Sequence, residues 1–276
     1  MTINCKGKLI DLSSPKVMGI LNITPDSFYD GGQYQSDQHI LNQVEKMLSE
    51  GATFIDIGAY SSRPGADDIA VEEEKNRLLP VLKLLNKTFK DDILISVDTF
   101  RSEIADLAIQ NEACMINDIS AGKLDSKMMF VIAEYQVPYV MMHMKGNPQN
   151  MKSLSHYQNL MLEVKTYFSE RLKAAREKGI NDVIIDPGFG FAKTIAHNFE
   201  MLDKFELFKD FDLPVLCGVS RKSMIYKTLK TSADQALNGT TALHALVLYK
   251  GANILRVHDV KEAVECVKLI EQIRLV

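Results

Sequence analysis

Residues 17–32, VMGILNITPDSFYDGG, decide between two α/β folds that the rest of the chain allows. The stretch begins as an apolar run, leaves it at Asn22, and continues through a polar loop that contains Pro25 and closes on Gly31 and Gly32. The first strand of an open, doubly wound sheet usually leads into a glycine-rich phosphate-binding turn. Asn-Ile-Thr-Pro stands at that point here, so the sequence favours a (β/α)8 barrel, with the doubly wound sheet as the alternative.

The rest of the chain repeats one unit, a short apolar run followed by a longer amphipathic stretch. The apolar runs lie at residues 17–23, 53–58, 93–98, 114–118, 139–144, 183–188, 214–220 and 253–259. They are apolar throughout rather than alternating, which is typical of parallel strands that are covered on both faces. The helical stretches include residues 160–178, 236–250 and 260–273. This pattern predicts a TIM barrel that forms a single domain over residues 1–276.

Two smaller patterns complete this expectation. Residues 3–12, INCKGKLIDL, alternate in polarity and predict an N-terminal hairpin at the bottom of the barrel. Gly51 and Gly251 hold equivalent places in the similar segments EGATF and KGANI. We expect each glycine to end a helix just before the next strand.

Composition excludes several classes of protein. The 276 residues are 46% hydrophobic and carry a net charge of −4, and they contain no dense cluster of basic residues. We therefore expect neither a nucleic-acid-binding protein nor a membrane-surface protein. No apolar run reaches the length of a signal peptide or a membrane span, and the four cysteines have no C-x-x-C spacing. These features predict a soluble cytoplasmic protein with reduced thiols.

Polar residues follow the predicted strands at their carboxyl ends, which form the active-site rim of a barrel. They are Asn22, Ser61, Ser62, Arg63, Asp98, Asn117, His143, Asp186, Ser220, Arg221, Lys222, Arg256, His258 and Asp259. Asp98 and Asp186 could instead be helix N-caps, and a lone histidine such as His258 could be structural. Capping is a weaker explanation for polar groups at all the strand ends, so we expect a binding site there.

One set of these side chains suits a flat heterocycle. Asp98, Asn117 and Asp186 supply acceptors for amino and ring N–H donors. Lys222 can donate to a carbonyl or ring nitrogen of the same ligand. Lys222 also stands where a helix is expected to begin, and the helix dipole disfavours a cation there, so a structural role explains it less well.

A second set suits an anion. Arg63, Arg256 and His258 can bind a phosphate, and the spacing of two residues between Arg256 and His258 predicts that both side chains enter the same space. Asn22 could hold Mg²⁺ through its oxygen, with phosphates completing the coordination shell. The two sets together indicate a heterocyclic phosphate ester as the ligand.

The chain resembles the dihydropteroate synthase family in seven blocks that span almost its whole length. These blocks are MGILNITPDSFYDGG, SSRPGA, SVDT, IND, DPGFGFAKT, GVSRKS and ILRVHDV. One departure concerns the second loop, where the family usually reads Gly-Glu-Ser-Thr-Arg-Pro-Gly after Gly58. This chain instead reads Ala59-Tyr60-Ser61-Ser62-Arg63-Pro64-Gly65. The change bears on the shape of the loop rather than on the reaction.

The resemblance implies that 6-hydroxymethyl-7,8-dihydropterin diphosphate reacts with 4-aminobenzoate to give 7,8-dihydropteroate and diphosphate, in folate biosynthesis. It implies that the pterin is bound by Asp98, Asn117, Asp186 and Lys222, in a slot lined by Met141 and Phe191. It implies that diphosphate, with Mg²⁺, is bound by Asn22, Arg63, Arg256 and His258. It implies that aminobenzoate lies near Phe28, Ser62, Pro64 and Ser223.

The resemblance also implies a homodimer, and it gives the opening stretch a role. Asn22 would lie beside the metal and the diphosphate, and the following loop would be a flap that closes over the second substrate. Pro25 limits the paths of this flap, and Gly31 and Gly32 can act as its hinge.

Two other functions stay open. A pterin-dependent methyltransferase that serves a corrinoid shares this kind of barrel, but it has no need of the cationic set at Arg63, Arg256 and His258. A non-catalytic pterin-binding paralogue is a second alternative, and Tyr60, where the family has Glu, keeps it open. The retained Lys222 argues against that paralogue.

Overall fold

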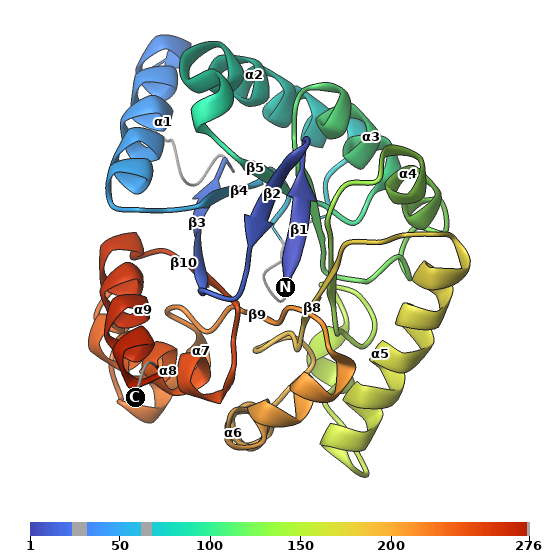
Figure 1. Cartoon of the computed structure of the whole chain (residues 1–276), viewed down its shortest axis with the longest axis vertical. Helices are drawn as coiled ribbons and strands as arrows, with labels where there is room; N and C mark the ends of the chain where they lie inside the picture. The colour runs from blue at the N-terminus through green and yellow to red at the C-terminus, as the bar shows by residue number, and fades with distance from the viewer. Residues whose placement is uncertain (24–31, 62–67, 275–276) are drawn as a thin grey trace.

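The computed structural model describes residues 1–23, 32–61 and 68–274, and it confirms the barrel (Figure 1). Eight parallel strands form one sheet in the order β8-β7-β6-β5-β4-β3-β10-β9. A bridge between Ile185 and Val215 joins the two outer strands of this order and closes the barrel. The strands are β3 (Lys16–Asn22), β4 (Phe54–Gly58), β5 (Ile95–Asp98), β6 (Met115–Asp118), β7 (Tyr139–Met142), β8 (Val183–Asp186), β9 (Leu216–Cys217) and β10 (Ile254–Val257).

Helices surround the strands as an outer ring (Figure 1). They are α1 (Gly32–Ser49), α2 (Val71–Phe89), α3 (Ser102–Gln110), α4 (Met128–Tyr135), α5 (Leu160–Glu177), α6 (Ile195–Asp203), α7 (Ser223–Thr228), α8 (Leu237–Lys250) and α9 (Val260–Arg274). Short 3₁₀ turns lie at η2 (Lys90–Asp92), η3 (Met151–Leu154) and η4 (Phe205–Phe211). The expected end of α8 is confirmed, because Gly251 has a φ of 111° and its N–H caps the last turn.

The two faces of each strand meet different surroundings. On β4, Ile55 and Ile57 pack in the large core between the strands and the helices. Phe54 points the other way, into the lumen, with Met18 of β3 and Ile254 of β10. Because side chains alternate along a strand, Asp56 points into the lumen above Phe54.

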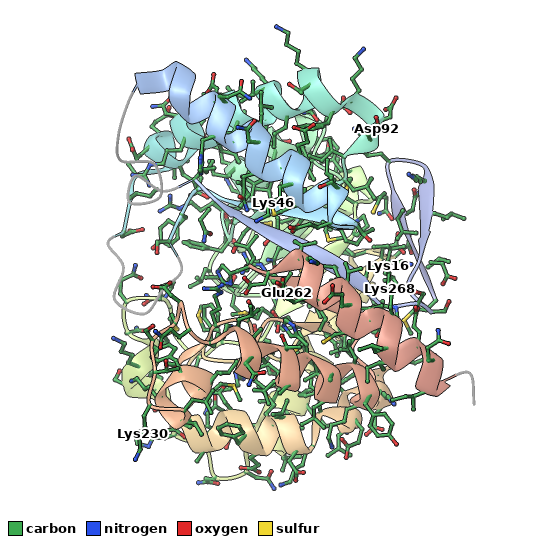
Figure 2. All side chains as sticks on the ribbon, turned by 90° about the vertical axis from the view of Figure 1, so that its left-hand side faces the viewer. Lys16, Lys46, Asp92, Lys230, Glu262 and Lys268 are labelled. Atoms are coloured by element: carbon green, nitrogen blue, oxygen red, sulfur yellow. The ribbon has the colours of Figure 1, made fainter. Side chains whose placement is uncertain are left out.

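The predicted hairpin is present at one end of the barrel, as Figures 1 and 2 show. Strands β1 (Thr2–Cys5) and β2 (Lys8–Asp11) pair antiparallel, and one face of the hairpin is buried. Ile3, Ile10 and Leu12 join the apolar lumen residues, so the hairpin closes this end of the lumen with apolar side chains. The opposite end, where the strands finish, is the end that carries polar groups.

The cysteines agree with the prediction of reduced thiols. Cys5, Cys114, Cys217 and Cys266 are all buried and free of disulfides. Within the described residues, no helix has both the length and the apolar character that crossing a membrane requires.

Candidate active site at the barrel mouth

Barrel closure brings the expected polar residues of the strand ends together. Asp98 is in register with Gly58 on one side and with Asn117 on the other. Asp186 follows on β8, and Arg256 reaches in from β10. Residues from four strands therefore meet at one end of the lumen.

A hydrogen-bonded network lies at the centre of this group. Arg256 donates from Nε to Asp56 Oδ2 at 2.6 Å and from Nη2 to Asp98 Oδ2 at 2.8 Å. Asn117 donates from Nδ2 to the same oxygen of Asp56 at 3.0 Å. We refer to Asp56, Asp98, Asn117 and Arg256 as the central network.

Asp56 is the member that the sequence analysis missed. It lies inside the apolar run 53–58, which the pattern predicts to be a buried strand. A signal was present, because a carboxylate in the middle of a buried strand is rarely found there without a partner. Its partners could not be read from the sequence, since Arg256 is 200 positions away.

Burial moves the pKa values of several site residues toward neutrality. It raises the pKa of Asp98 to about 7, against the opposing effect of Arg256 and with a contribution from Asp56. It lowers the pKa of Lys222 to about 8, although the charge of Asp186 opposes that shift. Burial also raises the pKa of Asp186, against the effects of Lys222 and the Gly188 N–H. Shifted groups that face one another in this way are typical of binding and catalytic sites.

Lys222 is held over the loop that follows β8. Its Nζ donates to the carbonyl of Phe189 and lies 4.8 Å from the ring centroid of Phe191. The loop turns sharply at Gly188, where φ is 70° and a Cβ atom would lie 2.2 Å from the carbonyl oxygen of His143. Only glycine fits there, and the Gly188 N–H donates to Asp186 Oδ1 at 2.8 Å.

The expectation that Met141 lines the slot is wrong. Met142, not Met141, is in register with Asp186, so it is Met142 that shares the lumen direction of that carboxylate. Met141 points outward into the core beneath the helices. Met142 packs instead in a small apolar cluster against which Phe191 lies, so this cluster forms the apolar wall expected of Met141.

Arg256 and His258 contact different groups, although we expected them to share one space. His258 lies one residue beyond the end of β10, and its Nδ1 is 3.0 Å from Ser220 Oγ. Arg256 is bound to the carboxylates of the central network instead. The structure thus joins Arg256, expected in the anion set, directly to Asp98, expected in the heterocycle set.

The second loop is described only in part. Arg63, Ser62 and Pro64 lie outside the described residues, as does Phe28 of the first loop with the proposed flap. Ser223 is described and is the first residue of α7.

Tyr60 marks the departure from the family pattern, and it is buried. Its hydroxyl accepts from Gln149 Nε2 at 2.8 Å, and its ring meets Phe100 edge-on with centroids 5.1 Å apart. The guanidinium of Arg101 lies 5.2 Å from the centre of the Tyr60 ring. Tyr60 therefore connects the loops that follow β4, β5 and β7.

The described residues do not form a complete metal site. No group of three or more His, Cys, Asp or Glu side chains among them could hold a metal ion. Asn22 and Asp98 flank the Cα of Gly58, where a Cβ atom would lie 3.4 Å from Asn22 Oδ1 and 3.9 Å from Asp98 Oδ2. This donor set fits Mg²⁺ only if the ligand brings most of the oxygens, which is how Mg²⁺ is commonly bound beside phosphates.

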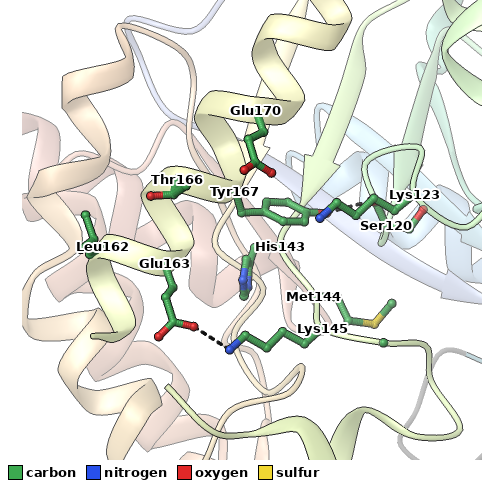
Figure 3. Close-up of a pocket in the computed structure, with 11 residues that line it drawn as sticks. Ser120, Lys123, His143, Met144, Lys145, Leu162, Glu163, Thr166, Tyr167 and Glu170 are labelled. Carbon is green, nitrogen blue, oxygen red and sulfur yellow. Dashed lines mark hydrogen bonds and ion pairs between the residues drawn. The ribbon is translucent and has the colours of Figure 1, made fainter. Parts of the chain in front are cut away.

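A separate pocket of about 540 Å³ lies beside the mouth, between the loops after β6 and β7 and helix α5 (Figure 3). Its floor includes His143, and across it Lys145 pairs with Glu163 at 2.7 Å. None of the residues expected to bind a substrate lines this pocket. The candidate active site is therefore the polar mouth and not this hollow.

Comparisons with known proteins agree with this geometry. The family model described as "Pterin binding enzyme" matches residues 18–258. The dihydropteroate synthase of Escherichia coli K12 is 40% identical to this chain over 98% of its length and 96% of the relative. That of Synechocystis is 40% identical over 92% of this chain and 89% of the relative.

Solved structures give the same result. The Yersinia pestis dihydropteroate synthase, in a sulfonamide drug complex, superposes with a TM-score of 0.93 at 38% identity and covers 100% of both chains. The Xanthomonas albilineans enzyme with 4-aminobenzoic acid superposes with a TM-score of 0.91 at 37% identity, over 100% of this chain and 98% of that one. The chain belongs to the dihydropteroate synthase family of pterin-binding enzymes.

Proposed function

We propose that the protein is a transferase that joins 6-hydroxymethyl-7,8-dihydropterin diphosphate to 4-aminobenzoate, giving 7,8-dihydropteroate and releasing diphosphate. The observation that carries the proposal is the barrel mouth, where acceptor oxygens on three strands face Lys222 and Arg256. Identity of 40% to named dihydropteroate synthases over nearly the whole chain supports the reaction.

The pterin ring is proposed to bind at the acceptor side of the mouth. Asp186 and Asp98 accept from the amino group and ring N–H groups, as does the amide oxygen of Asn117. Lys222 donates in the opposite direction, to the carbonyl or a ring nitrogen. Phe191 and Met142 supply the apolar wall, since Met141 points away from the lumen.

The diphosphate is proposed to bind at the cationic side. Arg256 is proposed to interact with it, supported by its position at the mouth, and His258 and Arg63 are proposed to assist. Asn22 would hold Mg²⁺ jointly with the diphosphate oxygens, because its Oδ1 lies beside Gly58 at the barrel mouth. Bound there, Mg²⁺ would neutralise negative charge on the leaving diphosphate.

The residues of the chain then favour substitution at the pterin methylene. The C–O bond to diphosphate breaks with its electron pair leaving on oxygen, the amine lone pair forms the C–N bond, and the nitrogen releases a proton. Arg256 stabilises the charge that develops on the leaving group, while Asp98 and Asp186 place negative charge near the electron-poor pterin. No protein nucleophile is required.

The aminobenzoate is proposed to bind beside Ser223, together with Phe28, Ser62 and Pro64 of the first two loops. Closure of the first loop on diphosphate and Mg²⁺ would create this site, so binding is ordered. Calorimetry should find weak aminobenzoate binding to the protein alone and clearly tighter binding with diphosphate and Mg²⁺. Equal affinities in the two conditions would contradict the ordered scheme.

A coupled assay of diphosphate release tests the function itself. Release should require both substrates and Mg²⁺, and mass spectrometry should identify dihydropteroate in equal amount. Release without aminobenzoate would indicate a hydrolase. Pterin binding without any release would indicate the non-catalytic paralogue, and methyl transfer from a methylated folate would indicate the methyltransferase.

We also propose a homodimer and a cytoplasmic location. Large apolar side chains are exposed on α8 and α9, namely Leu246, Tyr249, Leu269 and Ile273. These residues support an interface between two copies, and light scattering would measure the mass directly. Four cysteines without a disulfide fit a reducing compartment.

A further inference from the structure

The carboxylate of Asp56 connects two residues of the proposed pterin site. A single oxygen, Oδ2, accepts from Asn117 Nδ2 at 3.0 Å and from Arg256 Nε at 2.6 Å. Asp56 is fully buried and lies beneath the mouth, and Asn117 and Arg256 are the two side chains that connect it to the mouth.

The contact with Asn117 determines which end of its amide faces the ligand. A side-chain amide has one donor end and one acceptor end. A carboxylate only accepts, so it selects the NH₂ end, and the reverse orientation would bring two acceptor oxygens together. The carbonyl oxygen of Asn117 is then the end left for other partners.

We propose that Asp56 is a positioning residue that orients the amide of Asn117, so that Asn117 presents an acceptor to an N–H donor of the pterin. This inference rests on the proposed function, because it takes the pterin ring to lie against Asn117. It adds a residue that itself touches neither substrate.

The surroundings of Asp56 argue against a role in stability alone. Its second oxygen, Oδ1, is buried without a hydrogen-bond partner among the described residues, and so is Oγ of Ser96, the residue in register with it on β5. An unpartnered buried oxygen destabilises the folded state. Phe54, two residues earlier on the same face, fills the lumen without that cost.

A double-mutant cycle separates the route through Asn117 from the route through Arg256. Asp56→Asn is compared with the unchanged protein, and the same substitution is compared in an Asn117→Ala background. Calorimetry with 6-hydroxymethyl-7,8-dihydropterin, which has no phosphate, reports ring binding. We expect Asp56→Asn to weaken binding about tenfold in the unchanged protein and less than about threefold in the Asn117→Ala background.

Equal losses in the two backgrounds would overturn the proposal, because they would place the effect in Arg256 or in the fold. Ser96→Ala is the matched control, since it alters the neighbouring buried group and should leave pterin affinity unchanged. Failure of the unchanged protein to bind any pterin would overturn the proposed function instead.

A second measurement needs no variant of Asp56. The side-chain amide signal of Asn117, assigned in the NMR spectrum by its loss in Asn117→Ala, should exchange its protons slowly in the unliganded protein. Asn42, which is exposed on α1, provides the comparison. Exchange of Asn117 as fast as that of Asn42 would show that Asp56 does not hold the amide, whether or not Asp56→Asn folds.

Discussion

The two ends of the barrel lumen are built on the same strands and differ completely in chemistry. Residues two positions apart on a strand point in the same direction. On four strands, the first residue of such a pair is apolar and belongs to a lower layer of the lumen, and the second is polar and belongs to an upper layer. The pairs are Phe54 and Asp56, Met115 and Asn117, Ile184 and Asp186, and Ile254 and Arg256. The lower layer packs with the hairpin, and the upper layer forms the central network and the proposed pterin site. The residues that stabilise the fold and the residues proposed to bind the ligand therefore lie at different depths of the same lumen.

The largest effect is expected from a substitution in the lower layer. Phe54→Ala removes a fully buried ring and leaves a cavity, which should lower the free energy of unfolding by about 3–5 kcal/mol. Urea unfolding measures this loss. Pterin affinity of the folded variant should change little, and Leu9→Ala, at an exposed position of the hairpin, should change stability by less than about 0.5 kcal/mol. A loss of pterin affinity comparable to the loss of stability would mean that the two layers are not separate.

A substitution in the upper layer should affect ligands more than the fold. Arg256→Ala removes a charge-assisted contact, and we expect it to weaken the diphosphate ester by about 1.5–3 kcal/mol, or tenfold to a hundredfold. The loss for the non-phosphorylated hydroxymethyl pterin should be smaller, although not zero, because Arg256 also holds Asp98. Lys222→Ala should weaken both ligands alike. If Arg256→Ala weakens both ligands to the same extent, Arg256 serves the ring or the fold and not the diphosphate.

Asp186→Asn tests the acceptor side of the mouth. One acceptor oxygen becomes a donor, so a buried pair with the pterin is mismatched at an expected loss of about 1–3 kcal/mol in binding. Calorimetry with the pterin gives the value. Asp212→Asn is a suitable control, because Asp212 is exposed and its φ of 52° is one that asparagine also adopts. Unchanged affinity in Asp186→Asn would remove Asp186 from the site.

The smallest effect concerns pH. With the pKa of Asp98 at about 7 and that of Lys222 at about 8, pterin affinity should be greatest between these values. Below pH 7 Asp98 gains a proton and loses its strength as an acceptor, and above pH 8 Lys222 loses its charge. Each limb should change affinity by at most about tenfold per pH unit, since one proton is involved. Calorimetric titrations from pH 6 to about pH 9 would record both limbs.

The free energy of unfolding should depend on the protonation of Asp98 in the opposite sense to pterin affinity. Its pKa is raised in the folded protein, so the folded state keeps a proton that the unfolded state releases. The contribution of Asp98 to stability is thus present at low pH and is lost as the pH rises through about 7, whereas pterin affinity rises over the same range. Asp98→Asn should remove both slopes. If the acid limb of binding persists in Asp98→Asn, another group or the ligand itself causes it.

Much of the fold could be predicted because its signals are local. Apolar runs, amphipathic stretches and the alternation of residues 3–12 depend only on neighbours in the chain, and the structure has strands, helices and a hairpin at those places. The polar strand ends were also visible, because in a barrel they follow from where each run stops.

Errors arose where the direction of a side chain or a distant partner mattered. Met141 and Met142 are indistinguishable in a short apolar run, and a shift of one residue exchanges lumen for core. Asp56 was missed for a similar reason, since its importance lies in contacts with two other strands.

The sequence by itself determined the order of strands and helices, the N-terminal hairpin and the set of polar groups at the strand ends. Periodicity and the burial of apolar side chains are properties of short segments, so they can be read without a structure. Only the tertiary structure decided that Arg256 binds Asp56 and Asp98, which lie 200 and 158 positions away, and that Asn117 shares the same carboxylate. Closing the sheet into a barrel brings these residues within hydrogen-bond distance, and no pattern of neighbouring residues in the sequence encodes these contacts.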